Sequence, residues 1–245
     1  MADTMDIKFL NTCRRNLDVF SADTRYNSSN PDLALVNLTA RLDAGYPIAN
    51  DISVKFAAQQ IRVNNRQAIY EKIDAFAKKS RRYLRSCGAT EREIEDGNRY
   101  VNDLLGYTKA KPKNIANPDA PAGEGEETHA KAQLSYAALY ANLMAYREFL
   151  RNVTAYQPNE DEIKISTLDA LIEECGTANE DVSAGFAPLS AAWNLRDENL
   201  YTDEDSIINL FRKAKEYYKS LYEPKDPQYR AITRSDMTLR DYSRK

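Results

Sequence analysis

Glycine and proline are scarce in this sequence, with 8 and 9 among 245 residues. β-Sandwiches and β-barrels need a turn about every ten residues, and their turns depend on these two residue types. The scarcity therefore argues against both architectures and favours long helices with few tight turns.

Long apolar runs are lacking as well. No stretch approaches the roughly 18 apolar residues that a membrane-spanning helix needs. The segment from Met1 to Asp6 has neither a basic flank nor an apolar stretch, so we expect no signal peptide. The sequence predicts a cytoplasmic protein without a membrane partner.

Histidine and cysteine, which supply many metal and nucleophilic sites, are few. The one histidine, His129, follows Glu126-Glu127-Thr128, a setting that indicates a solvated side chain. A helical di-iron site needs a histidine on each of two helices, and a zinc site needs cysteine or histidine pairs. Cys13, Cys87 and Cys175 are odd in number and far apart, which indicates packing rather than a disulfide framework. We therefore expect no metal, no cofactor and no enzymatic activity.

Neither sign of charge dominates, because 34 Lys and Arg face 37 Asp and Glu for a net charge of −3. This balance gives no global attraction to nucleic acid or to an anionic membrane. Phosphate-binding loops and dinucleotide-binding glycine motifs are also missing. The carboxylates Asp161-Glu162 and Asp203-Glu204-Asp205 fall in the opening turns of predicted helices, where the helix dipole favours negative charge. A cation site is the alternative interpretation of these clusters.

What the sequence does contain is apolar residues at the spacing of an amphipathic helix. This pattern predicts an all-α protein, and Gly106 is expected to close one of its helices. The predicted helices cover about 6–20, 31–45, 50 onward, 68–87, 91–105, 129–153, 159–175, 181–196 and 203–221.

Capping residues set the expected ends of several of these helices. Asn30 and Asn159 are expected N-caps, because an asparagine side chain can accept a bond from a free N–H of the first turn. Gly45 and Gly176 are expected to stop helices in the left-handed conformation. Thr90-Glu91-Arg92-Glu93 is a capping box that starts a further helix.

A segment of different character, 107–128, separates two helical halves. It contains Lys109-Ala110-Lys111-Pro112-Lys113 and Gly123-Glu124-Gly125-Glu126-Glu127, and nothing in it can bury apolar surface. We predict a flexible linker there, between one helical bundle over 1–106 and a second over 129–245.

The two halves resemble each other in sequence. A shift of 130 residues aligns Tyr26 with Tyr156 and produces a gapless stretch that is rich in identities. We therefore predict two tandem, homologous up-and-down bundles of about four helices each, with the helix at Thr90 added to the first. The identical pairs in that stretch are Asp51/Asp181, Ser53/Ser183, Phe56/Phe186, Ala57/Ala187, Asn64/Asn194 and Arg66/Arg196.

Farther along the chain the best shift becomes 135. Five extra residues inside a continuous helix would rotate its apolar face by about 140°. We therefore expect a loop at Asp197 to Thr202 to absorb them. The pairs at the new shift are Ile73/Ile208, Phe76/Phe211, Lys78/Lys213 and Tyr83/Tyr218.

Two pairs of repeated positions lead to specific expectations. Phe56 and Phe186 are expected in equivalent core sites. The arginine of each repeated Asn-x-Arg, Arg66 or Arg196, lies at the end of an apolar stripe. There it can lay its stem on the core and reach backbone carbonyls or a carboxylate, while ligand binding is the alternative.

A family resemblance rests on four short segments near the C-terminal end: Asn194-Leu195-Arg196, Leu200-Tyr201, Lys215-Glu216-Tyr217-Tyr218-Lys219-Ser220 and Pro227-Gln228-Tyr229. Together they resemble a pattern in a family of uncharacterised bacterial all-helical proteins. That family has no assigned activity, so the resemblance implies a helical fold and adds no function.

The densest basic run offers one candidate binding surface. On a helix, Lys78, Arg81, Arg82 and Arg85 share one face, which could meet the phosphates of a nucleic acid. A solvated face paired with acidic neighbours is the other interpretation.

The sequence also contains 16 tyrosines, a residue type that suits interfaces because it buries a ring and keeps a polar tip. Together with the predicted repeat of helical bundles, they predict a non-catalytic helical scaffold. We expect it to bind another protein or itself as part of an assembly. Nucleic-acid binding through the basic face is the first alternative, and a helical enzyme of unknown type is the second.

Overall fold

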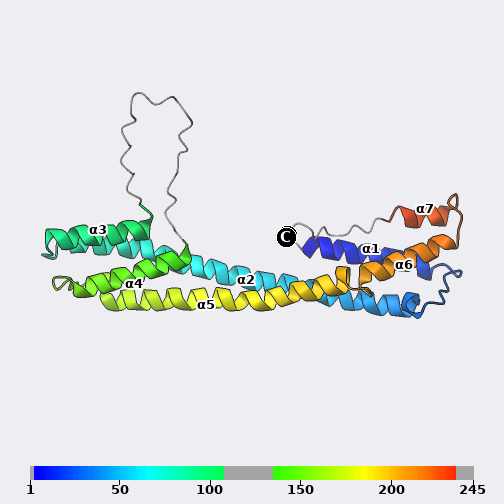
Figure 1. The fold of residues 1–245 in the computed structure, drawn as a ribbon, viewed down its shortest axis with the longest axis horizontal. Helices are drawn as coiled ribbons and strands as arrows, with labels where there is room; N and C mark the ends of the chain where they lie inside the picture. Colours follow the sequence, from blue (N-terminus) through cyan, green and yellow to red (C-terminus); the bar gives the residue numbers. More distant parts are fainter. Residues whose placement is uncertain (1–2, 108–134, 236–245) are drawn as a thin grey trace, which may run out of the picture. The chain divides into compact units, whose positions relative to one another are not determined.

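The computed structural model describes residues 3–107 and 135–235, and all regular structure in these ranges is helical (Figure 1). This confirms the prediction of an all-α protein. The elements are α1 (Asp3–Ser21), η1 (Pro31–Leu33), α2 (Leu35–Leu84), α3 (Glu91–Leu105), α4 (Tyr136–Asn152), η2 (Asp161–Ile163), α5 (Ile165–Arg196), η3 (Asp197–Thr202), α6 (Ile207–Ser220) and α7 (Pro227–Thr233).

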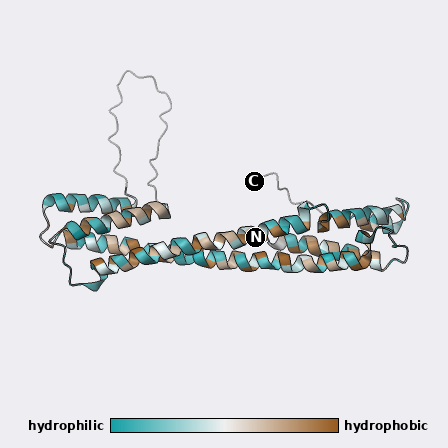
Figure 2. Ribbon diagram, turned by 60° about the horizontal axis from the view of Figure 1, so that its bottom comes forward, coloured by the Kyte–Doolittle hydropathy of each residue, from teal (hydrophilic) through white to brown (hydrophobic). Residues whose placement is uncertain are grey.

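Hydrophobic and hydrophilic residues alternate along these helices, as the mixed colours of Figure 2 show. Such interleaving is expected of helices that bury one stripe and expose the rest. Among the helices of residues 3–107 and 135–235, none has the length and apolar character that crossing a membrane requires.

The described chain divides into two compact units. Unit 1 comprises Met1–Gln60 and Ala184–Lys245, and unit 2 comprises Ile61–Ser183. This division differs from the predicted halves 1–106 and 129–245, because each unit combines segments from both halves. The predicted linker from residue 108 onward, and His129, lie outside the described residues.

The long helix α2 replaces three shorter predicted helices. Gly45 was expected to stop the first of them, but it lies inside α2 and packs closely within unit 1. A Cβ at this position would come within 2.6 Å of Ile207 Cδ1 and 3.0 Å of Leu10 Cδ2. Gly45 is therefore needed for the close approach of side chains, and the helix continues through it and through the exposed Pro47.

The same correction applies to Gly176, which lies inside α5 and does not end a helix. A Cβ there would sit 3.3 Å from the Tyr140 hydroxyl, so this glycine also serves packing. The prediction for Asn159 was wrong too, since Glu160 holds the N-cap of η2 and makes no side-chain capping bond.

Other expected caps are confirmed. The Asn30 side chain accepts a 3.0 Å hydrogen bond from the N–H of Asp32 at the start of η1. Thr90 and Glu93 form the reciprocal capping box of α3. Gly106 ends α3 with a φ of 71°, in the left-handed region that glycine tolerates.

The core of unit 1 is centred on Tyr26, which follows α1. Its ring stacks on Phe20 at 4.9 Å between centroids and meets Tyr217 of α6 edge to face at 5.2 Å. The Tyr26 hydroxyl donates a 2.8 Å hydrogen bond to the Leu33 carbonyl, across the turn that leads into α2. The aromatic cluster therefore holds the α1–α2 turn against α6.

The core of unit 2 has a corresponding centre at Tyr156, which follows α4. The Tyr156 hydroxyl donates a 2.8 Å bond to the Ile163 carbonyl across the turn into α5. Tyr83 of α2 meets the Tyr156 ring edge to face at 5.3 Å. The same local construction thus occurs in both units, 130 residues apart, with matching helical assignments and matching burial over 31–40 and 161–170.

Two expectations about the repeat were wrong. Phe56 and Phe186 are 39% and 54% exposed, so neither occupies a core site, whereas Phe76 and Phe211 are buried. The segment Asp197–Thr202 is no loop, because it continues α5 directly as a π-helix.

Burial explains the helical continuation of η3. Leu200 and Tyr201 of η3 are both buried, and the Tyr201 hydroxyl donates a 2.7 Å bond to Asp6 Oδ1 of α1. A helical backbone satisfies its own hydrogen bonds while it buries those side chains. The break that permits α6 to start anew falls at 203–206 instead.

Candidate functional site

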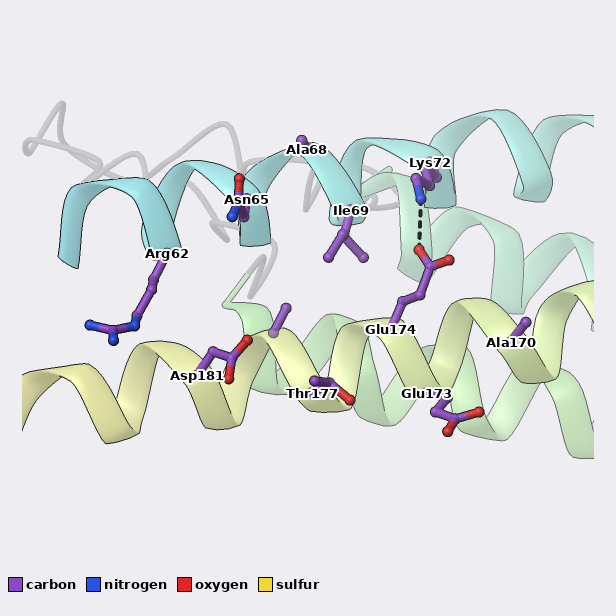
Figure 3. A pocket seen from close by; sticks show the side chains of 11 residues that line it. Arg62, Asn65, Ala68, Ile69, Lys72, Ala170, Glu173, Glu174, Thr177 and Asp181 are labelled. Atoms are coloured by element: carbon purple, nitrogen blue, oxygen red, sulfur yellow. Dashed lines mark hydrogen bonds and ion pairs between the residues drawn. The ribbon is translucent and has the colours of Figure 1, made fainter. Parts of the chain in front are cut away.

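A hollow with a volume of about 720 Å³ lies between α2 and α5 in unit 2 (Figure 3). We call it, together with its extension described below, the α2–α5 groove. Its α2 wall is formed by Arg62, Asn65, Ala68, Ile69 and Lys72, and its α5 wall by Ala170, Glu173, Glu174, Thr177, Ala178 and Asp181.

Helical spacing and short side chains create this hollow. On α2 the lining positions recur every three or four residues, which places them on one face of the helix. Ala68 of α2 lines the groove, as do Ala170, Thr177 and Ala178 of α5. Because these side chains are small, the two helices leave open space between their larger neighbours.

The two walls carry opposite charge. Arg62 and Lys72 are the cations of the α2 wall, while the α5 wall holds only carboxylates among its charged side chains. Lys72 Nζ reaches across the groove to Glu174 Oε2 at 2.6 Å, the contact drawn as a dashed line in Figure 3. Both side chains are about half exposed, so this ion pair contributes at most about 1 kcal/mol. A competing charge can displace it easily.

A second hollow of about 360 Å³ extends the groove along the same helices. It shares Lys72, Ala170 and Glu174 with the first, and it continues to Lys79, which forms an ion pair with Glu162. Apolar side chains from both helices form its floor: Ala75, Phe76 and Leu171. The walls therefore keep their opposite charges along the whole groove.

The predicted basic face of α2 is partly neutralised within unit 2. Lys78 Nζ pairs with Asp74 at 2.7 Å, a contact that raises the Lys78 pKa, and Arg85 donates a 2.9 Å bond to Asn98 Oδ1. Arg81 is half-buried, whereas Arg82 is exposed. Neither of these two arginines forms an ion pair with a residue of the described ranges. The face therefore presents fewer free cations than its sequence suggests.

The repeated arginines have different surroundings in the two units. Arg66 lies over the Tyr136 ring with its guanidinium carbon 3.9 Å from the centroid. Arg196 is buried and contacts two carboxylates, Asp6 at 3.4 Å and Asp197 at 2.6 Å. Arg196 thus makes the carboxylate contact expected of it, whereas Arg66 uses an aromatic face. The asparagines of the same motifs, Asn64 and Asn194, are exposed.

Nucleophiles and metal ligands do not assemble into a site in the described ranges. Cys13 and Cys175 are fully buried, and burial raises the pKa of the Cys175 thiol to about 11, with a further contribution from the Glu174 charge. Such a thiol stays protonated at neutral pH and is a poor nucleophile. No group of three or more metal-ligating side chains forms a metal site among residues 3–107 and 135–235.

Sequence reasoning missed the α2–α5 groove, although part of its signal is visible in the sequence. The carboxylates Glu173 and Glu174 and the small residues around them stand out on α5. The pairing of Glu174 with Lys72 and of Glu162 with Lys79 joins residues that are 102 and 83 positions apart, and it depends on packing that no local pattern encodes.

Comparisons of the chain with protein-family models, with curated proteins and with solved structures found no match.

Proposed function

We propose that this protein is a non-catalytic helical scaffold that binds a segment of another protein along the α2–α5 groove. One observation carries the proposal: a groove with small and apolar side chains at its base has a cationic wall on one side and an anionic wall on the other. Protein interfaces combine an apolar centre with complementary charges at the rim.

The chemistry of the lining residues favours binding over catalysis. The walls hold no histidine or cysteine, and the carboxylates face open solvent. A general acid or base works in an enclosed environment that is built around it, which these exposed side chains do not have.

The proposal includes an internal duplication. Tyr26 and Tyr156 make the same hydroxyl–carbonyl bond, and Tyr218 and Tyr83, which align at the shift of 135, each pack on one of them. In unit 1 a helix of the second repeat packs on the turn of the first, and in unit 2 the reverse holds. We propose that two homologous repeats have exchanged their last helical segments in this way, which are residues 68–84 of α2 and the helix α6.

Nucleic-acid binding remains the alternative function, and the exposure of Arg82 and Arg85 favours it. Contacts with four or five phosphates would make the affinity for duplex DNA fall steeply as salt is added. A plot of the logarithm of the affinity against the logarithm of the salt concentration would then have a slope of roughly −4. Replacing Arg81, Arg82 and Arg85 with glutamate should abolish such binding. If the protein is the scaffold that we propose, duplex DNA should not bind with this salt dependence.

Site-specific photo-crosslinking tests the proposed function. A benzoylphenylalanine in place of Ala68 lies in the groove, whereas the same group in place of exposed Gln67 points away from it along the same helix. In cells that make this protein, the Ala68 variant should form a discrete crosslinked species with a second protein. Equal crosslinking at both positions, or none at Ala68, would count against a docking groove.

A further inference from the structure

Unit 1 contains a smaller hollow that corresponds to one end of the α2–α5 groove. It has a volume of about 250 Å³ and is lined by Asp32, Asn37, Ala40, Arg41 and Leu210. A shift of 130 residues carries the first four to Glu162, Thr167, Ala170 and Leu171, and the shift of 135 relates Leu210 to Ala75. All five of these partners line the Lys79 end of the groove in unit 2.

The two equivalent hollows differ in size and polarity, because two of their lining positions hold different side chains. Arg41 stands where unit 2 has Leu171, and Arg41 forms an ion pair with Asp205 at the edge of the unit 1 hollow. Leu210 likewise stands where unit 2 has the smaller Ala75. The unit 1 hollow is therefore smaller and more polar, and only its unit 2 counterpart continues into the 720 Å³ space.

The length of the groove points to the form of its occupant. Between Arg62 and Lys79 the α2 wall rises by about 26 Å, at about 1.5 Å for each residue. A partner helix of about 18 residues has the same length. A helix satisfies its backbone hydrogen bonds internally, so it suits walls that offer side chains and no free backbone edge.

From the charge of the walls we infer that the α2–α5 groove binds an amphipathic α-helix of a partner protein. This inference rests on the proposed function and specifies its ligand. The helix carries a ridge of small apolar side chains, an acidic flank that faces Lys72 and Lys79, and a basic flank that faces Glu162 and Glu174. Its charges replace the two exposed ion pairs that cross the groove in the free protein.

The arrangement of charge also determines the direction of the bound helix. Turning a helix end for end exchanges its two flanks, which would bring the acidic flank against the carboxylates of α5. Juxtaposed like charges oppose binding. A partner helix whose positive and negative side chains are scattered around its axis is therefore excluded from binding in the groove.

A designed peptide tests the inference on the full-length chain. The probe is a fluorescein-labelled helical peptide of about 18 residues, the length of the groove, with an alanine and leucine ridge, one glutamate flank and one lysine flank. Fluorescence anisotropy should show saturable binding that weakens as salt is added. A peptide of the same composition with its charges scattered around the helix should bind roughly tenfold more weakly or worse.

The duplicated hollow supplies a matched control for a blocking substitution. Ala170→Trp fills the groove, and Ala40→Trp places the same side chain at the equivalent position of unit 1. Both alanines are exposed, and unchanged thermal melting would show that both variants fold. Only Ala170→Trp should weaken peptide binding, by roughly tenfold or more. Equal loss in both variants, or no loss in either, overturns the inference.

Reversal of one wall tests the charges themselves. The double variant Lys72→Glu and Lys79→Glu keeps Arg62 but gives the α2 wall a net negative charge. The original peptide should therefore lose binding, and a peptide with lysine on both flanks should recover it. Failure of that recovery overturns the charge assignment. If crosslinking at Ala68 succeeds while the designed peptide does not bind, the helical occupant is wrong and the proposed function stands. If crosslinking also fails, the proposed function fails with it.

Discussion

Tyr83 of α2 packs edge to face on Tyr156, with the two ring centroids 5.3 Å apart. These residues belong to different halves of the sequence, which the segment between α3 and α4 separates. In unit 1 the relationship is reversed, since Tyr218 of the second half packs on Tyr26 of the first at 6.4 Å. Each aromatic core therefore needs side chains from both halves.

This shared construction predicts the behaviour of a nicked chain. A protease site inserted between α3 and α4 should allow cleavage into two fragments that remain together, because each unit contains residues of both. The fragments should elute as one species in size-exclusion chromatography and separate only when urea unfolds the units. Fragments that separate without denaturant would instead indicate two independent bundles divided at the linker.

The hydroxyl–carbonyl bonds of Tyr26 and Tyr156 predict a matched pair of stability losses. Tyr26→Phe and Tyr156→Phe each remove a 2.8 Å bond and leave a buried carbonyl without that donor. Each substitution should lower the free energy of unfolding by about 1–2 kcal/mol, measured by urea denaturation. Tyr107→Phe, at a residue that is 55% exposed, is the control and should change little. A loss at only one of the two buried tyrosines would argue against equivalent turns.

Local sequence signals predicted the ends of helices where the signal was complete. The Thr90–Glu93 capping box and Gly106 define α3 as expected, because each acts on backbone groups within one turn. Gly45 misled the prediction, since its meaning depends on Ile207, which lies far away in the sequence. A glycine that stops a helix and a glycine that permits close packing look alike until the partner is known.

The candidate site was harder to predict than the fold. The shift of 130 residues pairs Tyr26 with Tyr156, whose hydroxyls make the same bond, but it could not show that Tyr83 would pack on Tyr156. The groove arises because α2 packs beside η2 and α5, which brings Lys72 to Glu174 and Lys79 to Glu162. A pattern read along one helix cannot identify the helix that it will face.

The burial of the repeated phenylalanines predicts a contrast in stability. Phe76→Ala and Phe211→Ala truncate buried rings and should each cost about 3–5 kcal/mol. Phe56→Ala and Phe186→Ala truncate exposed rings, and each should cost less than about 1 kcal/mol, because little apolar area leaves a buried environment. Urea denaturation of the four variants checks the contrast. Similar losses at all four positions would place Phe56 and Phe186 in a core after all.

Buried tyrosines predict the pH dependence of stability. Burial raises the pKa of Tyr26 and of Tyr146 to about 12, above the ordinary value of about 10 that an unfolded chain has. The folded state therefore holds these protons more tightly than the unfolded state does. Their contribution to stability is fully present below pH 10 and is lost progressively as the pH rises from about 10 to about 12.

Urea denaturation at a series of pH values checks this expectation. Between about pH 8 and 9.5 these tyrosines should not change the free energy of unfolding, and above about pH 10 the free energy of unfolding should fall. Tyr146→Phe removes one of the responsible groups, together with its 2.8 Å bond to Ser80. This variant should be less stable than the unmodified protein at neutral pH and should lose less stability on going to alkaline pH. Spectrophotometric titration at 295 nm provides an independent check, because the tyrosines that ionise only on unfolding should do so in step with the loss of helical circular dichroism. If all 16 tyrosines titrate near pH 10 while the helices persist, the rings are not buried as described.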